Sequence, residues 1–257
     1  MLVCPKCKCE LKKENQSFKC IHNHTFDIAK QGYVNLSMKQ KKNTGDNALM
    51  VKARSAFLEK DYYDFMRQYV KSKIEDFHID ICIDAGCGQG YYTKEFATVV
   101  KHAYGIDLSK EAILYASKKD KNSLYIVGSL FDMPFLNNTI DCITSIFVPL
   151  GEKEIYRCLK QDGYWIVVQP GPDHLWQLKE FLYEIPYKNE EVEKEKEGFH
   201  LVSQNCISNI LFVDDVWSLL EMTPYRYKTK LEALERLKKS EGFDVTFEFV
   251  VSIWKKA

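Results

Sequence analysis

A glycine-rich turn directly after an apolar segment constrains the fold of this chain more than any other feature. Residues 79–84 are Ile-Asp-Ile-Cys-Ile-Asp, a short apolar run typical of a strand, and Ala-Gly-Cys-Gly-Gln-Gly follows at 85–90. Glycines at such a turn let the backbone approach a ligand, and the helix expected over 92–100 points its N-terminus at the same place. The segment therefore predicts a nucleotide-binding loop between a strand and a helix.

Strand and helix patterns alternate after this loop. Short apolar runs predict strands at 103–107, 123–127, 140–147 and 163–169, and helical spacing separates them at 110–119, capped by Ser109, and at 152–159. This alternation predicts an α/β fold with a doubly wound parallel sheet. Beyond Pro172 the patterns predict three more helices and a final extended segment. They lie at 174–183, at 213–222 with Asp214 as its cap, at 231–240 and at 243–254, with a solvated charged run at 190–197.

Four metal-ligand residue types stand at the front of the chain. Cys4 and Cys7 form one pair, and Cys20 and His24 form a second pair about fifteen residues later. Zinc binds four thiolate or imidazole donors in a tetrahedron, and two short turns supply two donors each. Three cysteines and a histidine leave no position for water, so we predict one structural zinc ion.

Two alternatives to this ligand set stay open. Cys9 can replace Cys7, and His22 can replace His24, but the resulting spacings fit a metal-binding turn less well. A redox dithiol is disfavoured, because no thioredoxin-like strand precedes the Cys-x-x-Cys pair.

Charge is distributed unevenly although the net charge is zero. Residues 1–60 carry 12 Lys and Arg against 5 Asp and Glu, a balance of +7, and the rest carries 24 against 31, a balance of −7. A basic front end favours a polyanionic partner, while the alternative is a solvated lysine face. Nine cysteines and the absence of a secretory signal or long apolar run predict a cytoplasmic protein without a membrane partner.

The details of the glycine loop favour S-adenosylmethionine over a nicotinamide cofactor. Gly86 and Gly88 have GxGxG spacing rather than the GxGxxG spacing of dinucleotide sites, and Asp84 before them suits an ammonium group. Asp107 ends the second strand, where it can accept both ribose hydroxyls. After the third strand, residues 128–135 resemble the segment of class I methyltransferases that lies against adenine. The resemblance implies an adenine contact at Ser129, where the family often has an acid, with Asp132 as a less favoured substitute.

We expect three regions along the chain. Residues 1–36 form the zinc-binding module, residues 37–77 a linker with helices, and residues 78–257 the nucleotide-binding domain. Residues 39–46 are basic and turn-like, and helical spacing from 48 to 77 breaks near Asp61, which predicts two helices.

The chain resembles the bacterial 23S ribosomal RNA (guanine-N1)-methyltransferase family nearly from end to end. Gly32-Tyr-Val-Asn-Leu36 and Pro170-Gly-Pro-Asp-His-Leu175 carry the resemblance most specifically. Further segments that carry it are the four metal-ligand residues, Phe26–Gln31, Gly45-Asp46, Ala53-Arg54, Ala56–Leu58, Asp84–Tyr92 and Met222-Thr-Pro224. One departure is Tyr227, where family members often have tryptophan.

The resemblance implies a class I methyltransferase fold, one structural zinc and a hairpin of 23S rRNA as the substrate. It places cofactor contacts at Tyr63, Gly88, Gln89 and His174. It also implies a homodimer, and the family includes members that give macrolide resistance. Two other functions stay open on the residues alone, namely a small-molecule methyltransferase and a non-catalytic zinc RNA-binding protein.

Methylation of guanine N1 sets the chemistry that the site must perform. N1 carries a proton and is a poor nucleophile until that proton leaves, so the enzyme must accept or release it. N1 also lies on the Watson–Crick edge, so the target base must be unpaired or flipped. The base that takes the proton is expected near residues 147–149 or 170–174, but the sequence does not single it out. Candidate stacking partners are Tyr33, Tyr91, Tyr92, Phe181, Tyr183 and Tyr225.

Overall fold

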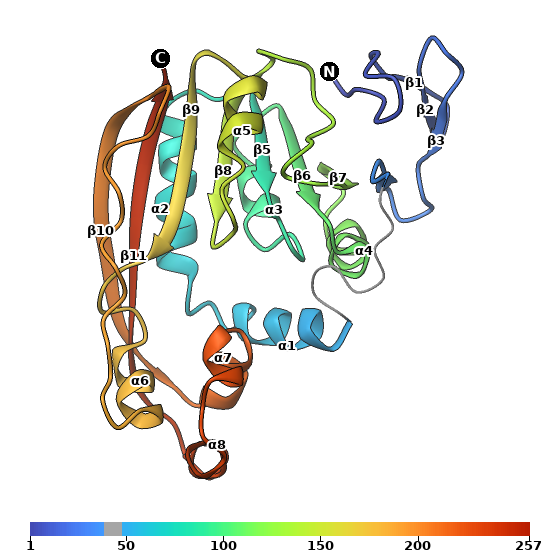
Figure 1. Cartoon of the computed structure of the whole chain (residues 1–257). Helices are drawn as coiled ribbons and strands as arrows, with labels where there is room; N and C mark the ends of the chain where they lie inside the picture. The colour runs from blue at the N-terminus through green and yellow to red at the C-terminus, as the bar shows by residue number, and fades with distance from the viewer. Residues whose placement is uncertain (39–47) are drawn as a thin grey trace.

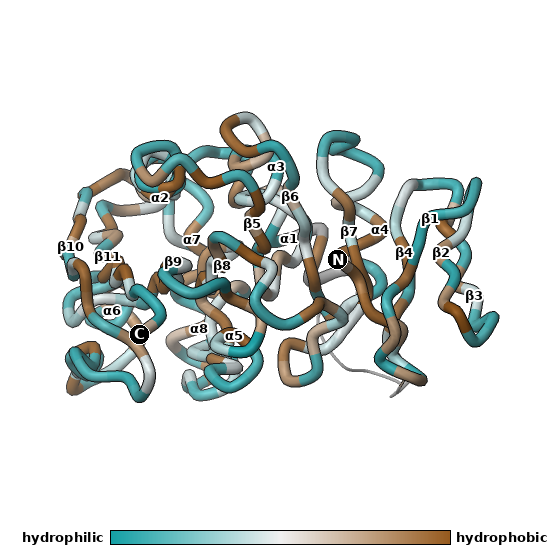
Figure 2. The backbone as a smooth tube through the Cα atoms, turned by 90° about the horizontal axis from the view of Figure 1, so that it is seen from above, coloured by the Kyte–Doolittle hydropathy of each residue, from teal (hydrophilic) through white to brown (hydrophobic). Residues whose placement is uncertain are grey.

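A computed structural model describes residues 1–38 and 48–257, apart from the side chains of residues 48–50, 52 and 53. An eight-stranded sheet forms the centre of the molecule, with the strand order β10-β11-β9-β8-β5-β6-β7-β4. Seen from above, these strands stand in a row with the N-terminal module at one end (Figure 2). The strands of this sheet are β4 (Val34–Asn35), β5 (Ile81–Ala85), β6 (His102–Asp107), β7 (Ser123–Val127), β8 (Ile140–Ile146), β9 (Leu159–Pro170), β10 (Phe199–Val213) and β11 (Phe243–Lys256).

The six strands from β9 to β4 run parallel, as the alternating pattern predicts. β10 and β11 pair antiparallel with each other, and β11 pairs antiparallel with β9, so the sheet is mixed rather than purely parallel. β10 is a strand of 15 residues that the sequence patterns do not predict. The chain leaves β5 for β6 on one side and later returns to β8 on the other. The topological switch point of the sheet therefore lies between β5 and β8, where ligands of such folds bind.

Helices cover both faces of the sheet, and each face has its own core. α2 (Asp64–Asp76), α3 (Thr93–Phe96) and α4 (Lys110–Lys119) lie on one face, and α5 (Glu152–Cys158) lies on the other (Figure 1). Neighbouring residues of β5 alternate between the two cores: Cys82 packs with α2 residues, and Ile83 packs with α5 residues. This period of two is what a strand covered on both faces requires.

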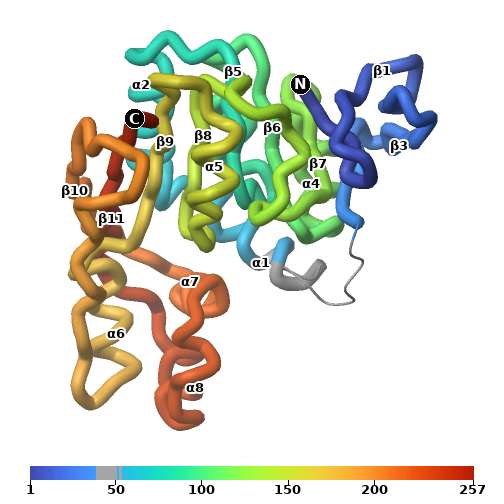
Figure 3. The backbone as a smooth tube through the Cα atoms, turned by 45° about the horizontal axis from the view of Figure 1, so that its top comes forward, coloured from blue at the N-terminus to red at the C-terminus, as the bar shows by residue number. Residues whose placement is uncertain are grey.

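The remaining helices lie beyond the carboxyl ends of the parallel strands (Figure 1). They are α1 (Ala48–Leu58), α6 (Trp176–Leu182), α7 (Val216–Glu221) and α8 (Leu231–Lys238), with a 3₁₀ turn at Pro224–Tyr227. α6, α7 and α8 form a lobe next to β9, β10 and β11, at the opposite end of the molecule from the N-terminal module (Figure 3). None of the described helices is long and apolar enough to cross a membrane.

Two local predictions need correction. The helix expected over 92–100 is only the four-residue α3, followed by turns, and the cap of α7 is Asp215 rather than Asp214. The side chain of Asp215 accepts a hydrogen bond from the backbone N–H of Ser218, whereas Asp214 pairs with Lys60 and accepts from the hydroxyl of Tyr62. The predicted break near Asp61, between α1 and α2, is confirmed, and so is the Ser109 cap, which accepts from the N–H of Ala112.

The N-terminal module packs directly onto the edge of the main sheet. Its own three-stranded sheet consists of β1 (Lys12–Glu14), β2 (Ser17–Lys19) and β3 (Thr25–Asp27), and β4 then pairs with β7. Leu2, Leu11 and Phe18 belong to the same buried cluster as Ile126 and Phe135 of the larger domain. The predicted basic linker at 39–46 lies outside the described residues.

Candidate active site and metal centre

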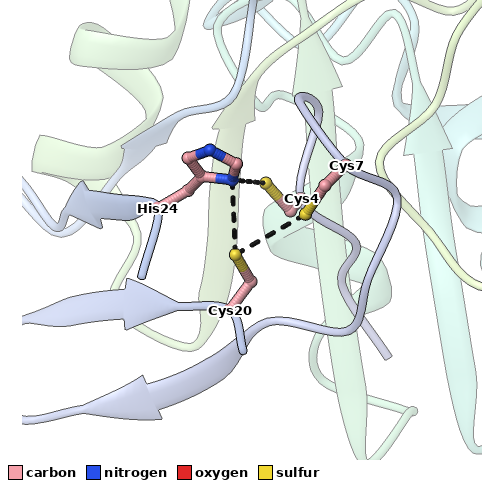
Figure 4. A group of neighbouring side chains, drawn as sticks. All are labelled: Cys4, Cys7, Cys20 and His24. Atoms are coloured by element: carbon pink, nitrogen blue, oxygen red, sulfur yellow. Dashed lines mark hydrogen bonds between the residues drawn. The ribbon is translucent and has the colours of Figure 1, made fainter. Parts of the chain in front are cut away.

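The four predicted zinc ligands come together at one point of the N-terminal module (Figure 4). Their ligand atoms all lie within 4.8 Å of one another. The Sγ atom of Cys4 is 3.4 Å from Nδ1 of His24, and the Sγ atom of Cys20 is 3.5 Å from the same nitrogen and 3.6 Å from the Sγ atom of Cys7. A tetrahedron with ordinary zinc–sulfur and zinc–nitrogen bonds has edges of about 3.5–3.8 Å. These three distances are close to the edges of such a tetrahedron, so the donor set fits a zinc ion.

Each ligand pair is held by a tight turn. Lys8 and Asn23 adopt left-handed backbone conformations, with φ of 59° and 60°. The N–H of Lys8 donates to the carbonyl of Cys4, and the N–H of Asn23 donates to the carbonyl of Cys20. Cys9 and His22, the alternative ligands, form a separate group with Cys7 that offers three donors. Of the two groups, only Cys4, Cys7, Cys20 and His24 supply the four donors of a closed site.

A large cavity opens at the switch point between β5 and β8. Its volume is about 570 Å³. Five of the predicted cofactor residues line it: Tyr63, Gly86, Gly88, Gln89 and His174. Other lining residues come from segments far apart in the sequence and include Arg54, Phe147, Tyr187, Asn189, Thr223 and Tyr225. Of the predicted stacking partners, Tyr91, Tyr92 and Tyr225 face the cavity, and the others do not line it.

The glycine loop takes a shape that side chains would prevent. Gly86 has a φ of +79°, and a Cβ atom there would lie 2.4 Å from Cγ1 of Val148. Gly90 has a φ of +78°, and its Cβ atom would lie 2.6 Å from the hydroxyl of Tyr125. The loop turns back toward β6, because the N–H groups of Gly86 and Cys87 both donate to the carbonyl of Ile106. Glycine thus lets the backbone itself form the floor of the cavity.

Asp84 lies beneath the glycine loop rather than on the cavity wall. Its side chain is 2% exposed, and its two oxygens accept hydrogen bonds from the hydroxyls of Thr93 at 2.6 Å and Thr144 at 2.9 Å. Burial raises the pKa of Asp84 to about 6, and the two hydroxyl bonds oppose that rise. A buried carboxyl group with so high a pKa would gain from a nearby cation.

Asp107 and Ser129 stand at the ends of the next two strands, outside the residues that line the cavity. One oxygen of Asp107 accepts from the N–H of Gly88 at 3.0 Å, and the other accepts from the N–H of Ser109 at 2.7 Å. Asp107 thereby ties the glycine loop to the end of β6. The hydroxyl of Ser129 accepts from the N–H of Phe131, which places it in a turn rather than in the cavity.

His174 is a neutral hydrogen-bond donor. It is 5% exposed, and burial, aided by the positive charge of Lys179, lowers its pKa to about 3. The backbone N–H of Glu248 donates to Nδ1 of His174 at 3.3 Å, so the ring proton resides on Nε2. A histidine in this state donates a hydrogen bond at neutral pH and does not take up a proton.

In the described part of the chain, the cavity wall carries one cationic group and several aromatic groups but no carboxylate. Among the lining residues that the structure describes, no aspartate or glutamate occurs, and Arg54 is the charged side chain. The expected proton acceptor at 147–149 or 170–174 is therefore not a carboxylate of the described wall, because the lining members of these segments are Phe147, Val148, Pro170 and His174.

The sequence missed Tyr187 and Asn189, and no local pattern could have found them. They belong to the stretch between α6 and β10, which has no regular structure and ends in a charged run. Asn189 reaches the site through two bonds to the segment that carries His174: its Nδ2 donates to the carbonyl of Gly171, and its N–H donates to the carbonyl of Pro172.

A fold of this kind, with the ligand cavity at the switch point and a zinc-type donor set in front, defines a class I methyltransferase with an N-terminal zinc ribbon. Comparison with known proteins agrees. A model of the methyltransferase domain matches residues 83–167, and a zinc-ribbon model described as "RlmA, N-terminal" matches residues 2–44. The YcgJ protein of Bacillus subtilis, a solved structure, superposes with a TM-score of 0.51 at 17% identity over 74% of this chain and 97% of its own length, which shows the fold.

Sequence relatives identify the family. A Bacillus subtilis protein named "Putative 23S rRNA (guanine-N(1)-)-methyltransferase YxjB" is 30% identical over 100% of this chain and 97% of its own length. The 23S rRNA (guanine(748)-N(1))-methyltransferase of Streptomyces fradiae is 30% identical over 70% of this chain and 67% of its own length. The chain belongs to the 23S rRNA (guanine-N1)-methyltransferase family. Its cofactors are S-adenosylmethionine, the methyl donor that this fold serves, and one structural zinc ion.

Proposed function

We propose that this protein transfers the methyl group of S-adenosylmethionine to N1 of a guanine in a hairpin loop of 23S rRNA. The observation that carries the proposal is the full-length similarity to a family with this activity, joined to a cavity whose lining residues we divide into two halves by the segments they come from. The glycine loop at the end of β5 forms one half. The ends of β8 and β9, His174 and Leu175 before α6, and the segments at 187–189 and 222–225 form the other.

The first half suits the cofactor. Gly86, Gly88 and Gln89 would approach it through the loop, Tyr63 and His174 would contact it across the cavity, and Asp107 would accept the ribose hydroxyls. Asp84 would act from below, where its charge favours the ammonium group. Ser129 would lie beside adenine at the end of β7. S-Adenosylmethionine supplies an electrophilic methyl group, so these residues contribute binding and alignment.

The second half suits a flipped base. Its aromatic members, Phe147, Tyr187 and Tyr225, offer faces on which a purine can stack. A base held there lies next to the glycine loop, so its N1 can face the methyl group that the cofactor presents.

The zinc module would hold the RNA. Cys4, Cys7, Cys20 and His24 are the proposed zinc ligands, and residues 1–38 carry six lysines against three acidic residues, a balance of +3. A basic surface binds phosphates in a salt-dependent way. The homodimer implied by the resemblance stays a prediction, which sedimentation of the purified protein would check.

Methyl transfer from labelled S-adenosylmethionine to 23S rRNA tests the proposal. We expect incorporation into the RNA, with a new reverse-transcription stop at one guanine of a hairpin loop, because a methyl group on N1 blocks base pairing. We also expect KM for RNA to rise with salt. Absence of transfer to any RNA would contradict the proposal, and salt-insensitive transfer to a small molecule would favour a metabolite methyltransferase.

A further inference from the structure

Lys179, on α6, is a fully buried lysine close to the cavity. Its side chain is 0% exposed, and no carboxylate of the described residues forms an ion pair with it. Its ammonium group donates to the backbone carbonyl of Tyr187 at 3.1 Å and to Oδ1 of Asn189 at 2.8 Å. Burying a lysine among neutral partners costs free energy, so the arrangement calls for an explanation.

The groups that Lys179 touches are part of the cavity wall. Tyr187 and Asn189 line the cavity, and so does Tyr225. The ammonium nitrogen lies 5.3 Å from the ring centroid of Tyr187 and 5.7 Å from that of Tyr225. Lys179 itself does not line the cavity, so its charge lies one layer beneath the wall of the base-binding half. Few water molecules can screen a charge in that position.

The reaction creates a negative charge in that half. When the N1 proton leaves to solvent, the guanine becomes an anion whose charge is shared by N1 and O6. The N1 lone pair then forms the new N–C bond to the methyl group while the S–C bond breaks. Sulfur keeps the electron pair, which leaves a neutral thioether and a neutral methylated base. The described wall has no carboxylate to take the proton, so stabilising the anion is the available means of activating N1.

We propose that Lys179 is a positioning residue that anchors Tyr187 and Asn189 in the wall of the base-binding half and whose buried positive charge favours the N1-deprotonated form of the target guanine. The inference rests on the proposed function. It assigns the activation of N1 to a cation below the wall, acting across the aromatic rings, rather than to a general base.

Other ionisable groups around Lys179 influence its protonation. Burial lowers the pKa of Lys179, and the carboxylate of Asp173 opposes this. Asp173 itself pairs with exposed Lys188 at 2.9 Å. Titratable groups that contact α6 or the segments flanking it include neutral His174, Glu248 on β11, Arg236 on α8, and the phenols of Tyr183, Tyr187 and Tyr225. Both elements also carry charged residues, namely Asp244, Lys255 and Lys256 on β11 and Glu232, Glu235 and Lys238 on α8.

Single-turnover methylation of the RNA as a function of pH tests the proposal. In Lys179→Met the cation is lost, N1 holds its proton more tightly, and the rising limb of the pH–rate profile should move up by about one pH unit, which makes the rate on that limb about tenfold lower. Lys179→Arg keeps the positive charge and should therefore keep the pH–rate profile of the wild-type protein. Lys230→Met, at an exposed lysine of the same lobe that pairs with Glu184, is the matched control and should leave the profile unchanged.

Two further measurements separate charge from anchoring. Lys179→Gln keeps a donor for the neighbouring carbonyls and lacks the charge, so it should shift the profile as Met does. Asn189→Ser removes an anchor and keeps the charge, so it should raise KM for RNA without a shift. The Met variant is expected to fold, because an apolar side chain of similar length avoids the cost of a buried charge.

The outcomes are distinguishable. If Lys179→Met lowers the rate equally at every pH, or leaves it unchanged, the inference about Lys179 is wrong while the methyltransferase activity stands. If the wild-type protein methylates no RNA, the proposed function itself fails. Binding of S-adenosylhomocysteine by each variant, measured by calorimetry, shows that the cofactor half remains intact.

Discussion

At the scale of single residues, the buried carboxyl group of Asp84 links stability to cofactor binding. Its folded-state pKa of about 6 lies above the ordinary value of 3.8 because burial disfavours the charged form. The folded protein therefore holds this proton more tightly than the unfolded chain does. The contribution of Asp84 to stability falls as pH rises from about 4 to about 6, by up to about 3 kcal/mol.

Asp84→Asn should thus separate the effect of Asp84 on stability from its effect on cofactor binding. At pH 7 the cofactor-free variant should be more stable than the wild-type protein, and the difference should shrink toward pH 4. Affinity for S-adenosylhomocysteine should fall at least tenfold, because the charge beneath the loop is lost. Denaturant unfolding at both pH values and calorimetric titration measure the two effects. Unchanged affinity would remove Asp84 from the cofactor site.

The close contact between Gly86 and Val148 leads to a second prediction at the residue scale. Gly86→Ala adds a Cβ atom 2.4 Å from Cγ1 of Val148, at a φ of +79°, and should destabilise the protein by about 2–3 kcal/mol. Val148→Ala removes that methyl group, so the double variant should lose about 1 kcal/mol less than the sum of the single variants. Thermal unfolding of the four proteins gives the coupling. Gly32→Ala is the control, since Gly32 has a φ of +101° but no atom within 4 Å of the added Cβ atom.

Residue patterns predicted the parts of the site that are local in sequence. Gly86 and Gly88, which line the cavity, follow directly from a strand and the turn after it. The role of Asp107 in binding stays a prediction. Tyr187 and Asn189 could not be predicted, because only tertiary contacts, including the bonds to Lys179, bring them to the cavity. The burial of Lys179 could not be predicted for a related reason. A lysine on a helix is usually exposed, and nothing in the sequence around Lys179 indicates that tertiary contacts bury it.

At the scale of elements, the strands that could be predicted are those whose burial gives a short apolar run in the sequence. β7 has the predicted bounds of Ser123–Val127, and β5, covered on both faces, is a short apolar run. β10 escaped prediction because it is the sheet edge and faces solvent, so Gln204, Asn205 and Asn209 interrupt any apolar alternation. Its strand identity comes from pairing with β11 along nearly its whole length.

The N-cap of α7 gives a prediction for an element with a matched control. Asp215→Ala removes the acceptor for the N–H of Ser218 and should cost about 1 kcal/mol of stability. Because α7 leads into Met222 and Thr223 of the cavity wall, KM for RNA should also rise. Asp214→Ala loses an exposed pair with Lys60 and an exposed hydrogen bond from the hydroxyl of Tyr62, and should change stability by less than about 0.5 kcal/mol. Equal effects of the two variants in thermal unfolding would contradict the assignment of Asp215 as the N-cap of α7.

At the scale of the whole molecule, the question is how far the zinc module is independent of the methyltransferase domain. Leu2, Leu11 and Phe18 share a buried cluster with strands of the main sheet, and β4 extends that sheet beside β7. Exposed Lys8 also pairs with Asp132 at 2.6 Å. The module therefore stabilises one edge of the sheet. The cavity lies at the switch point, and none of the lining residues in the described part of the chain comes from residues 1–38.

Removal of zinc should consequently affect RNA binding and stability more than cofactor binding. A zinc ribbon without its metal loses most of its folding free energy, so chelation should lower the melting temperature and weaken RNA binding at least tenfold. The dissociation constant for S-adenosylhomocysteine at 25 °C should change less than about threefold, because β5 and β8 keep the core on their other face, to which the module contributes no residue. Asp84→Asn is the converse control, with zinc content kept and cofactor affinity lost. If chelation abolished cofactor binding as well, the shared cluster around Phe18 and Phe135 would have to be counted as part of the catalytic domain's own core.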